Sequence, residues 1–158
     1  MVKKRHALAG LAVVLAFAYA SLLSAPQPGA PPTAENKQLT LPSGGAIELE
    51  LACTPNERSQ GLSNRSPESL PRGRGMLFAF DSVGERGFWM KEMEFALDIA
   101  WIDAGKRVSF VEEGVPPCTP SGCPVYSHAG KYVLEVNAGE AKRLGISAGA
   151  VLAFDAGC

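Results

Sequence analysis

Short apolar runs, separated by turn-forming residues, constrain the fold of this chain most. With 17 Gly and 12 Pro among 158 residues, few segments are long enough for more than a brief helix or strand. The runs lie at 46–52, 76–80, 96–102, 107–112, 132–136 and 150–154. Their length and composition are typical of β-strands. The sequence therefore predicts a small, mostly-β single domain, like a barrel or a sandwich, with two short helices.

Both helices are predicted from local end signals. A capping box that begins at Thr54 starts the first helix, which should end near Asn64. Asn137 is positioned to cap a second helix over 138–144, and Gly145 should close it.

The run over 96–102 has the alternation of a two-faced strand. Leu97 and Trp101 should point to one face and Asp98 to the other. Residues 81–86, by contrast, are polar and are predicted to form a loop.

The N-terminus has the layout of an export signal over residues 1–25. A basic start precedes an apolar run, and small residues allow cleavage after Ala20. The alternative is an uncleaved anchor, because residues 7–25 are about long enough to span a bilayer. Both alternatives place the rest of the chain in the periplasm or outside the cell, with contact to the inner membrane only through an uncleaved leader.

A Pro- and Ala-rich linker over 26–37 should separate this leader from one folded domain at 38–158. The leader carries Lys3, Lys4 and Arg5 of the 15 basic residues, so 12 basic and 16 acidic residues remain, and the formal charge changes from −1 to −4. This charge argues against nucleic acid as a partner.

All four cysteines follow the leader, which favours disulfides in an oxidising compartment. Cys118 and Cys123 flank a turn-forming stretch and are predicted to pair, which leaves Cys53 for Cys158. A zinc site is the competing reading, but the Cys-x4-Cys spacing is unusual and His128 is the one histidine outside the leader. We therefore expect no metal and no cofactor.

Lys91 and Asp98 lie in a strongly apolar stretch, and Glu135 follows a similar pattern in a later strand. Charges are rarely buried without partners, so a polar cleft formed by these three residues would take a small polar ligand or a segment of an envelope protein. Two alternatives stay open: a hydrolase or lyase with Asp98 or Glu135 as general base, and a structural cell-envelope module. No recognisable catalytic motif is present.

Further binding candidates carry groups that recognise ligands: Arg65, Phe88, Trp89, Met90 and Asn137. The three consecutive apolar residues could line a pocket or pack in the core. Arg65 could form a guanidinium cluster with Arg72 and Arg74, or remain a solvated loop charge.

Several motifs, in order, resemble the domain-of-unknown-function 192 family: Gly61-Leu62 with Arg65, Gly75–Phe78, Phe88–Lys91, Leu97–Ile99, Pro117-Cys118 with Cys123, and Leu134–Gly139. The resemblance covers about residues 47–154. It implies a small mostly-β domain, often exported, without an established biochemical role. Glu92, Met93, Ala96 and Ala150 depart from the usual Asn, Thr, Pro and Asp of such sequences. The turn over 144–149 also resembles that of cradle-loop barrels.

Overall fold

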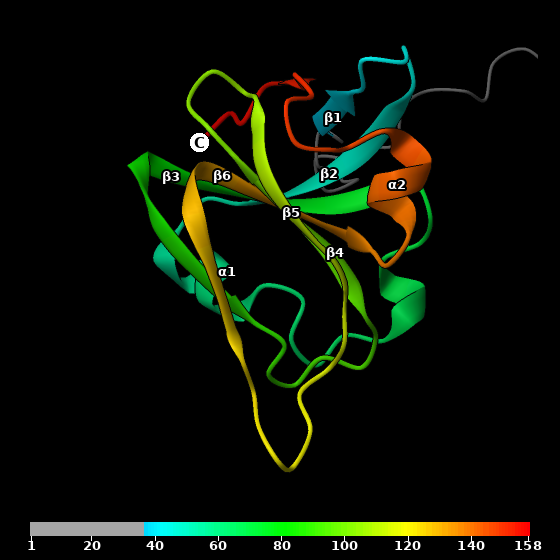
Figure 1. The fold of residues 1–158 in the computed structure, drawn as a ribbon, viewed down its shortest axis with the longest axis vertical. Helices are drawn as coiled ribbons and strands as arrows, with labels where there is room; N and C mark the ends of the chain where they lie inside the picture. Colours follow the sequence, from blue (N-terminus) through cyan, green and yellow to red (C-terminus); the bar gives the residue numbers. More distant parts are fainter. Residues whose placement is uncertain (1–36) are drawn as a thin grey trace, which may run out of the picture. The chain divides into compact units, whose positions relative to one another are not determined.

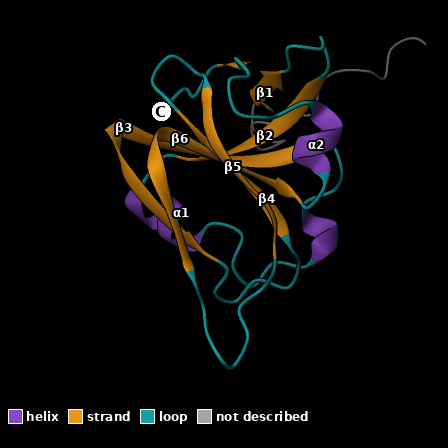
Figure 2. Cartoon of the chain, in the orientation of Figure 1, coloured by secondary structure: helices purple, strands orange, loops and turns teal. Residues whose placement is uncertain are grey.

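The computed structural model describes residues 37–158. Its strands are β1 (Lys37–Thr40), β2 (Ala46–Ala52), β3 (Arg74–Trp89), β4 (Leu97–Ile102), β5 (Val108–Val115), β6 (Val125–Asn137) and β7 (Ala153–Phe154). Its helices are α1 (Pro55–Gln60), α2 (Glu140–Leu144) and the 3-10 turn η1 (Pro67–Ser69). Strands predominate (Figure 2), so the prediction of a mostly-β domain with two short helices is confirmed.

The seven strands form one curled sheet, like half a barrel, in the order β5-β4-β6-β3-β2-β1-β7 (Figure 1). Neighbouring strands are antiparallel, except that β2 and β3 run parallel. A parallel pair needs a crossover connection. In this protein the crossover contains α1 and η1, which places them beside the sheet.

Apolar side chains form a core on each face of the sheet. Leu134 and Ile102 belong to the first core, which also contains Ala141 of α2. Phe78 and Trp101 belong to the second core, which extends to Leu62 beyond α1. Every residue of β4 is buried, because both cores cover this strand. The two-faced pattern predicted for it is confirmed.

The loop predicted over residues 81–86 is wrong. β3 continues through this segment and pairs with β6 from Gly84 onward, after a bulge that follows Ala79. Most side chains of this extension are exposed. Its backbone is held by pairing with β6 rather than by burial, so hydropathy carries no strand signal there.

The helix ends agree in part with the prediction. The capping box of α1 and the closure of α2 by Gly145, at φ 72°, are confirmed, whereas α1 ends at Gln60 rather than near Asn64. The expected cap by Asn137 is wrong, since this residue stays in β6. Its side-chain amide donates to the carbonyl oxygen of Leu70 instead.

Two disulfides join Cys118 to Cys123 and Cys53 to Cys158, as predicted. The second bond ties the end of β2 to the C-terminus. The expected leader, and the linker up to residue 36, lie outside the described residues. Within the described range, no helix combines the length and the apolar character needed to cross a membrane.

Candidate functional site

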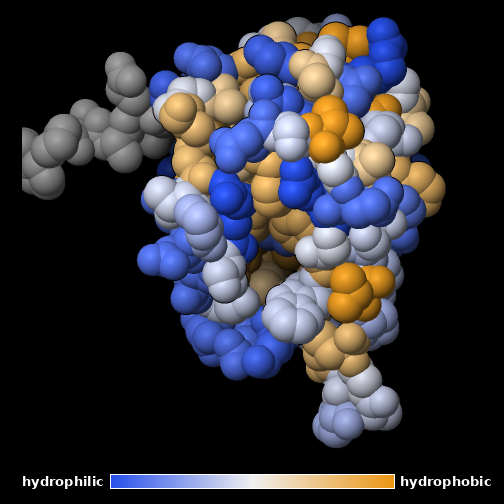
Figure 3. Space-filling view, turned by 90° about the vertical axis from the view of Figure 1, so that its left-hand side faces the viewer, coloured by the Kyte–Doolittle hydropathy of each residue, from blue (hydrophilic) through white to orange (hydrophobic). Residues whose placement is uncertain are grey.

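A hollow of about 230 Å³ lies between α1 and β3. Residues 58–63, from α1 and the turn after it, form one wall, and Phe78, Phe88 and Trp89 of β3 form the other. Glu135 of β6 completes the lining. This side of the molecule is hollowed in Figure 3, with an apolar interior inside a largely hydrophilic rim. The lining combines aromatic rings with five polar or charged side chains, those of Arg58, Ser59, Gln60, Ser63 and Glu135. Aromatic walls with convergent polar groups are typical of small-ligand sites.

Local sequence signals place the helical wall over the sheet. The hydroxyl of Thr54 accepts the backbone N–H of Glu57 at 3.2 Å, and the Glu57 carboxylate accepts that of Thr54 at 2.8 Å. Gly61 then turns the chain at φ 47°, where a Cβ would lie 3.2 Å from the Phe78 ring. Glycine suits this left-handed turn and also permits the close approach to the ring.

Glu135 is a buried acid without a partner. Its side chain is on the face opposite Leu134 and Val136, with Met76 and Ile99 beside it on the neighbouring strands. Glu135 is 5% exposed, and its carboxyl group makes no hydrogen bond or ion pair with residues 37–158. Burial raises the pKa of Glu135 to about 8, because the charged form loses its hydration. Near neutral pH the free protein therefore holds this group mainly as the acid.

Arg58 is the second charged residue of the lining, and hydrogen bonds to backbone carbonyl groups hold its side chain in place. Its Nη1 donates to the carbonyl oxygens of Cys53 and, at 2.9 Å, of Ala79. Its guanidinium lies 4.9 Å from the centre of the Phe80 ring, and that of Arg86 lies 4.1 Å from the same ring. Cations on aromatic faces are attracted by the ring quadrupole.

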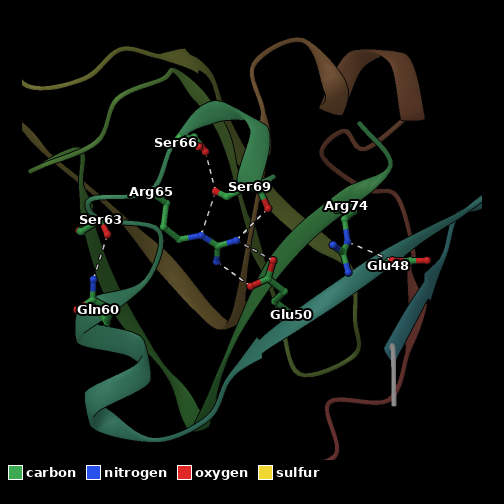
Figure 4. A network of polar contacts seen from close by, with 8 residues as sticks. All are labelled: Glu48, Glu50, Gln60, Ser63, Arg65, Ser66, Ser69 and Arg74. Carbon is green, nitrogen blue, oxygen red and sulfur yellow. Dashed lines mark hydrogen bonds and ion pairs between the residues drawn. The ribbon is translucent and has the colours of Figure 1, made fainter. Parts of the chain in front are cut away.

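A network of polar side chains adjoins the crossover (Figure 4). Arg65 donates to both carboxylate oxygens of Glu50, at 2.7 and 3.0 Å, and also to Ser69. The carboxylate raises the pKa of Arg65 through these bonds. This bidentate geometry fixes the turn that precedes η1 to the sheet.

The guanidinium cluster considered for the three arginines does not form. Arg74 Nε lies 3.1 Å from Glu48 Oε2, and Arg72 Nε lies 3.8 Å from Glu140 Oε1. With Arg65 on Glu50, each arginine has its own carboxylate, so the three charges do not converge on one anion site.

The structure does not bring Lys91, Asp98 and Glu135 together. Asp98 pairs with Val136 across β4 and β6, so its side chain lies on the face opposite Glu135. Its two oxygens accept the backbone N–H groups of Gly114, at 2.8 Å, and Ala141, at 2.9 Å. Asp98 thereby caps the N-terminus of α2, although its own strand, β4, is far from α2 in the sequence.

Lys91 and its neighbours separate as well. Lys91 is exposed, and its Nζ lies 5.8 Å from the Trp89 ring. Phe88 and Trp89 line the hollow, whereas Met90 is 2% exposed and packs in the second core.

Sequence reasoning missed the wall over 58–63. The capping box revealed the helix, but no periodic pattern in so short a helix indicated which side chains would face Phe78. Arg58 enters the lining because the crossover folds back over β3. Across residues 37–158, no three His, Cys, Asp or Glu side chains are placed to hold a metal ion.

Comparisons with known proteins match this chain to one family. The model of the DUF192 family, described as "Uncharacterized ACR", matches residues 39–154. A crystal structure of a "putative transcription regulator" from Sinorhizobium meliloti 1021 is 31% identical, covers 76% of this chain and 92% of that chain, and has a TM-score of 0.66. A protein of unknown function from Novosphingobium aromaticivorans DSM 12444 is 28% identical, with coverage of 80% and 92% and a TM-score of 0.64. Among curated proteins, none matches this chain.

Proposed function

Since this chain belongs to the DUF192 family, whose description assigns no activity, we propose a function from the geometry of the site. The folded unit is a binding domain that takes a small ligand, with an apolar body and one polar end, between α1 and β3. The observation that carries this proposal is the unpartnered Glu135 in the lining of an aromatic hollow. Buried polar groups in native proteins are nearly always hydrogen-bonded, so a lone carboxyl beside a hollow favours a ligand as its partner.

We place this binding domain outside the cytoplasm. The predicted leader supports this location, and so do the two disulfides, because such bonds persist in oxidising compartments. The regulatory role named for the Sinorhizobium protein is not extended to this chain. After removal of the leader the formal charge is −4, from 12 basic and 16 acidic residues, which opposes contact with nucleic acid.

An enzyme with Glu135 as general acid or base is the second candidate. The pKa of about 8 favours it, because proton transfer is most effective near the working pH. Among the described residues that line the hollow, however, Arg58 is the one other ionisable side chain. The hydroxyls of Ser59 and Ser63 also line the hollow, but neither has a histidine or a second carboxylate in the lining to activate it. Ligand binding therefore accounts for the site more simply than catalysis does.

A titration of the oxidised protein with small amphipathic molecules tests the binding function. We expect changes in backbone amide NMR signals to concentrate at residues 58–63 and 87–89. Trp89→Ala should weaken binding, whereas Phe110→Ala should not, because both rings are exposed (55% and 41%) and Trp89 alone of the two lines the hollow. Equal effects of the two substitutions, or signal changes confined to other regions, would contradict the proposal.

A further inference from the structure

The side chains in and around the hollow indicate the chemical class of its ligand. Resting on the binding function proposed above, we infer that it takes a primary alkylammonium, whose charged end reaches Glu135 and whose short apolar body contacts the rings of β3. Three independent features support this assignment: the row of carboxylates across the sheet, the aromatic wall, and the position of Arg58.

The first feature is a row of side chains across five neighbouring strands. The paired positions run from Glu50 through Met76, Glu135 and Ile99 to Glu112. Glu50 contacts the cation Arg65 at 2.7 Å, and Glu112 contacts the His128 ring at 2.9 Å. Glu135, between them, is the one acid of this row without a basic partner in the described part of the chain. A ligand that supplies a cation completes the same pattern.

The second feature is the aromatic wall. Phe78 and Phe88 meet edge to face, with ring centres 4.8 Å apart, and Trp89 also lines the hollow. Such rings attract cations, and the ammonium group of a lysine side chain is one of them. The protein's own cations already lie against Phe80 and Trp89, as described above.

The third feature restricts the charge that the other end of the ligand can carry. Arg58 lines the same hollow, and beyond its two carbonyl contacts no acceptor in residues 37–158 engages its other N–H groups. A second cation on the ligand would be repelled there, whereas a carboxylate would be attracted. The volume of about 230 Å³ also restricts the ligand to a short body. Monoamines and amino acids should therefore bind better than diamines.

Binding of a cation to this site is linked to the protonation of Glu135. The ammonium pairs with the carboxylate, so binding releases the proton that the free protein holds. Affinity should rise about tenfold per pH unit below pH 8, and level off above it. The other charged groups on this face are Arg58, Arg86 at the Phe80 ring, and the two pairs at the ends of the row, Glu50 with Arg65 and Glu112 with His128.

Four molecules of similar size test the inference by NMR titration of the oxidised protein between pH 6 and pH 9. These are n-butylammonium, 1,4-diaminobutane, butyramide and butyrate. We expect n-butylammonium to bind best, with the pH dependence given above. Glu135→Gln should weaken its binding about tenfold or more, because a charge-assisted hydrogen bond is lost. Glu113→Gln, which removes an exposed charge outside the lining, should leave binding unchanged.

The outcomes separate this inference from the function on which it rests. Tighter binding of butyramide or butyrate in the hollow would overturn the alkylammonium assignment and retain a ligand-binding hollow. Affinity for n-butylammonium that does not change with pH would also overturn it. If none of the four molecules perturbs residues 58–63 or 87–89, both the inference and the proposed function fail.

Discussion

At the scale of single residues, Asp98 and Glu135 show how surroundings decide the role of a buried carboxyl group. They are 1% and 5% exposed and lie on adjacent strands. Asp98 accepts two backbone N–H groups, whereas no donor in the described residues reaches Glu135. Asp98 therefore stabilises the fold, and Glu135 remains available to a ligand.

The first prediction concerns Asp98→Asn. The amide that replaces one carboxylate oxygen cannot accept a hydrogen bond, so one backbone N–H, of Gly114 or Ala141, loses its acceptor. We expect the free energy of unfolding to fall by about 2–3 kcal/mol. Asp103→Asn is the matched control, because Asp103 accepts from Arg107 in an exposed turn. Urea denaturation measures both, and equal losses would contradict the structural role of Asp98.

The second prediction is a pH dependence of stability that Glu135 causes. The pKa of this group is 4.5 in its ordinary state and about 8 in the folded protein. Between these values the unfolded chain has released a proton that the folded protein keeps. The free energy of unfolding should therefore decrease with rising pH, by up to about 1.4 kcal/mol per unit.

This contribution is complete below pH 4.5 and is lost above about pH 8. Urea denaturation of the wild-type protein and of Glu135→Gln, from pH 5 to pH 8.5, isolates it. The stability of the wild-type protein should decrease relative to that of the variant across this range. Parallel curves for the two proteins would show that Glu135 ionises normally in the fold.

At the scale of elements, the wall of the hollow depends on a helix of six residues. So short a helix has little stability of its own, and the capping box at Thr54 satisfies its first N–H groups. Gly61 and Arg58 then fix the other end to β3. The position of α1 therefore results from caps and tertiary contacts rather than from helix propensity.

The third prediction tests this dependence with Thr54→Ala. Loss of the cap should lower the free energy of unfolding by about 1 kcal/mol. Ser66→Ala serves as the control, because Ser66 precedes η1 but makes no side-chain capping bond. Thermal unfolding followed by circular dichroism compares the two variants. A larger loss for Ser66→Ala would refute the role of the capping box.

At the scale of the whole folded unit, the disulfides differ in the length of chain that they close. Cys53 and Cys158 are separated by 105 residues, and Cys118 and Cys123 by 5. A crosslink restricts the unfolded chain more when it closes a longer loop. The bond between β2 and the C-terminus should therefore contribute most to stability.

The fourth prediction follows from these separations. Replacing Cys53 and Cys158 by Ala should lower the free energy of unfolding by about 4–5 kcal/mol, against about 2 kcal/mol for the Cys118 and Cys123 pair. Denaturant unfolding of the two double variants, in the absence of reductant, gives the comparison. A greater loss for the short loop would show that local strain or packing, rather than chain entropy, dominates.

The sequence by itself determined the features whose physical cause is local. The capping box at Thr54, the end of α2 at Gly145 and the two faces of 96–102 follow from hydrogen bonds and periodicities within a few residues. The turn between Cys118 and Cys123 made their bond predictable in the same way. The mostly-β class followed because strand runs and turn residues alternate along the chain.

Only the tertiary structure decided which distant side chains meet. The register of β4 against β6 pairs Ile99 with Glu135, and this turns Asp98 to the opposite face. The crossover between β2 and β3 brings Arg58 to the hollow. Strand register and crossover path depend on packing over the whole sheet, which no short stretch of sequence encodes. Lys91, Asp98 and Glu135 therefore do not form the predicted cleft. Of the three residues, Glu135 alone lines the hollow.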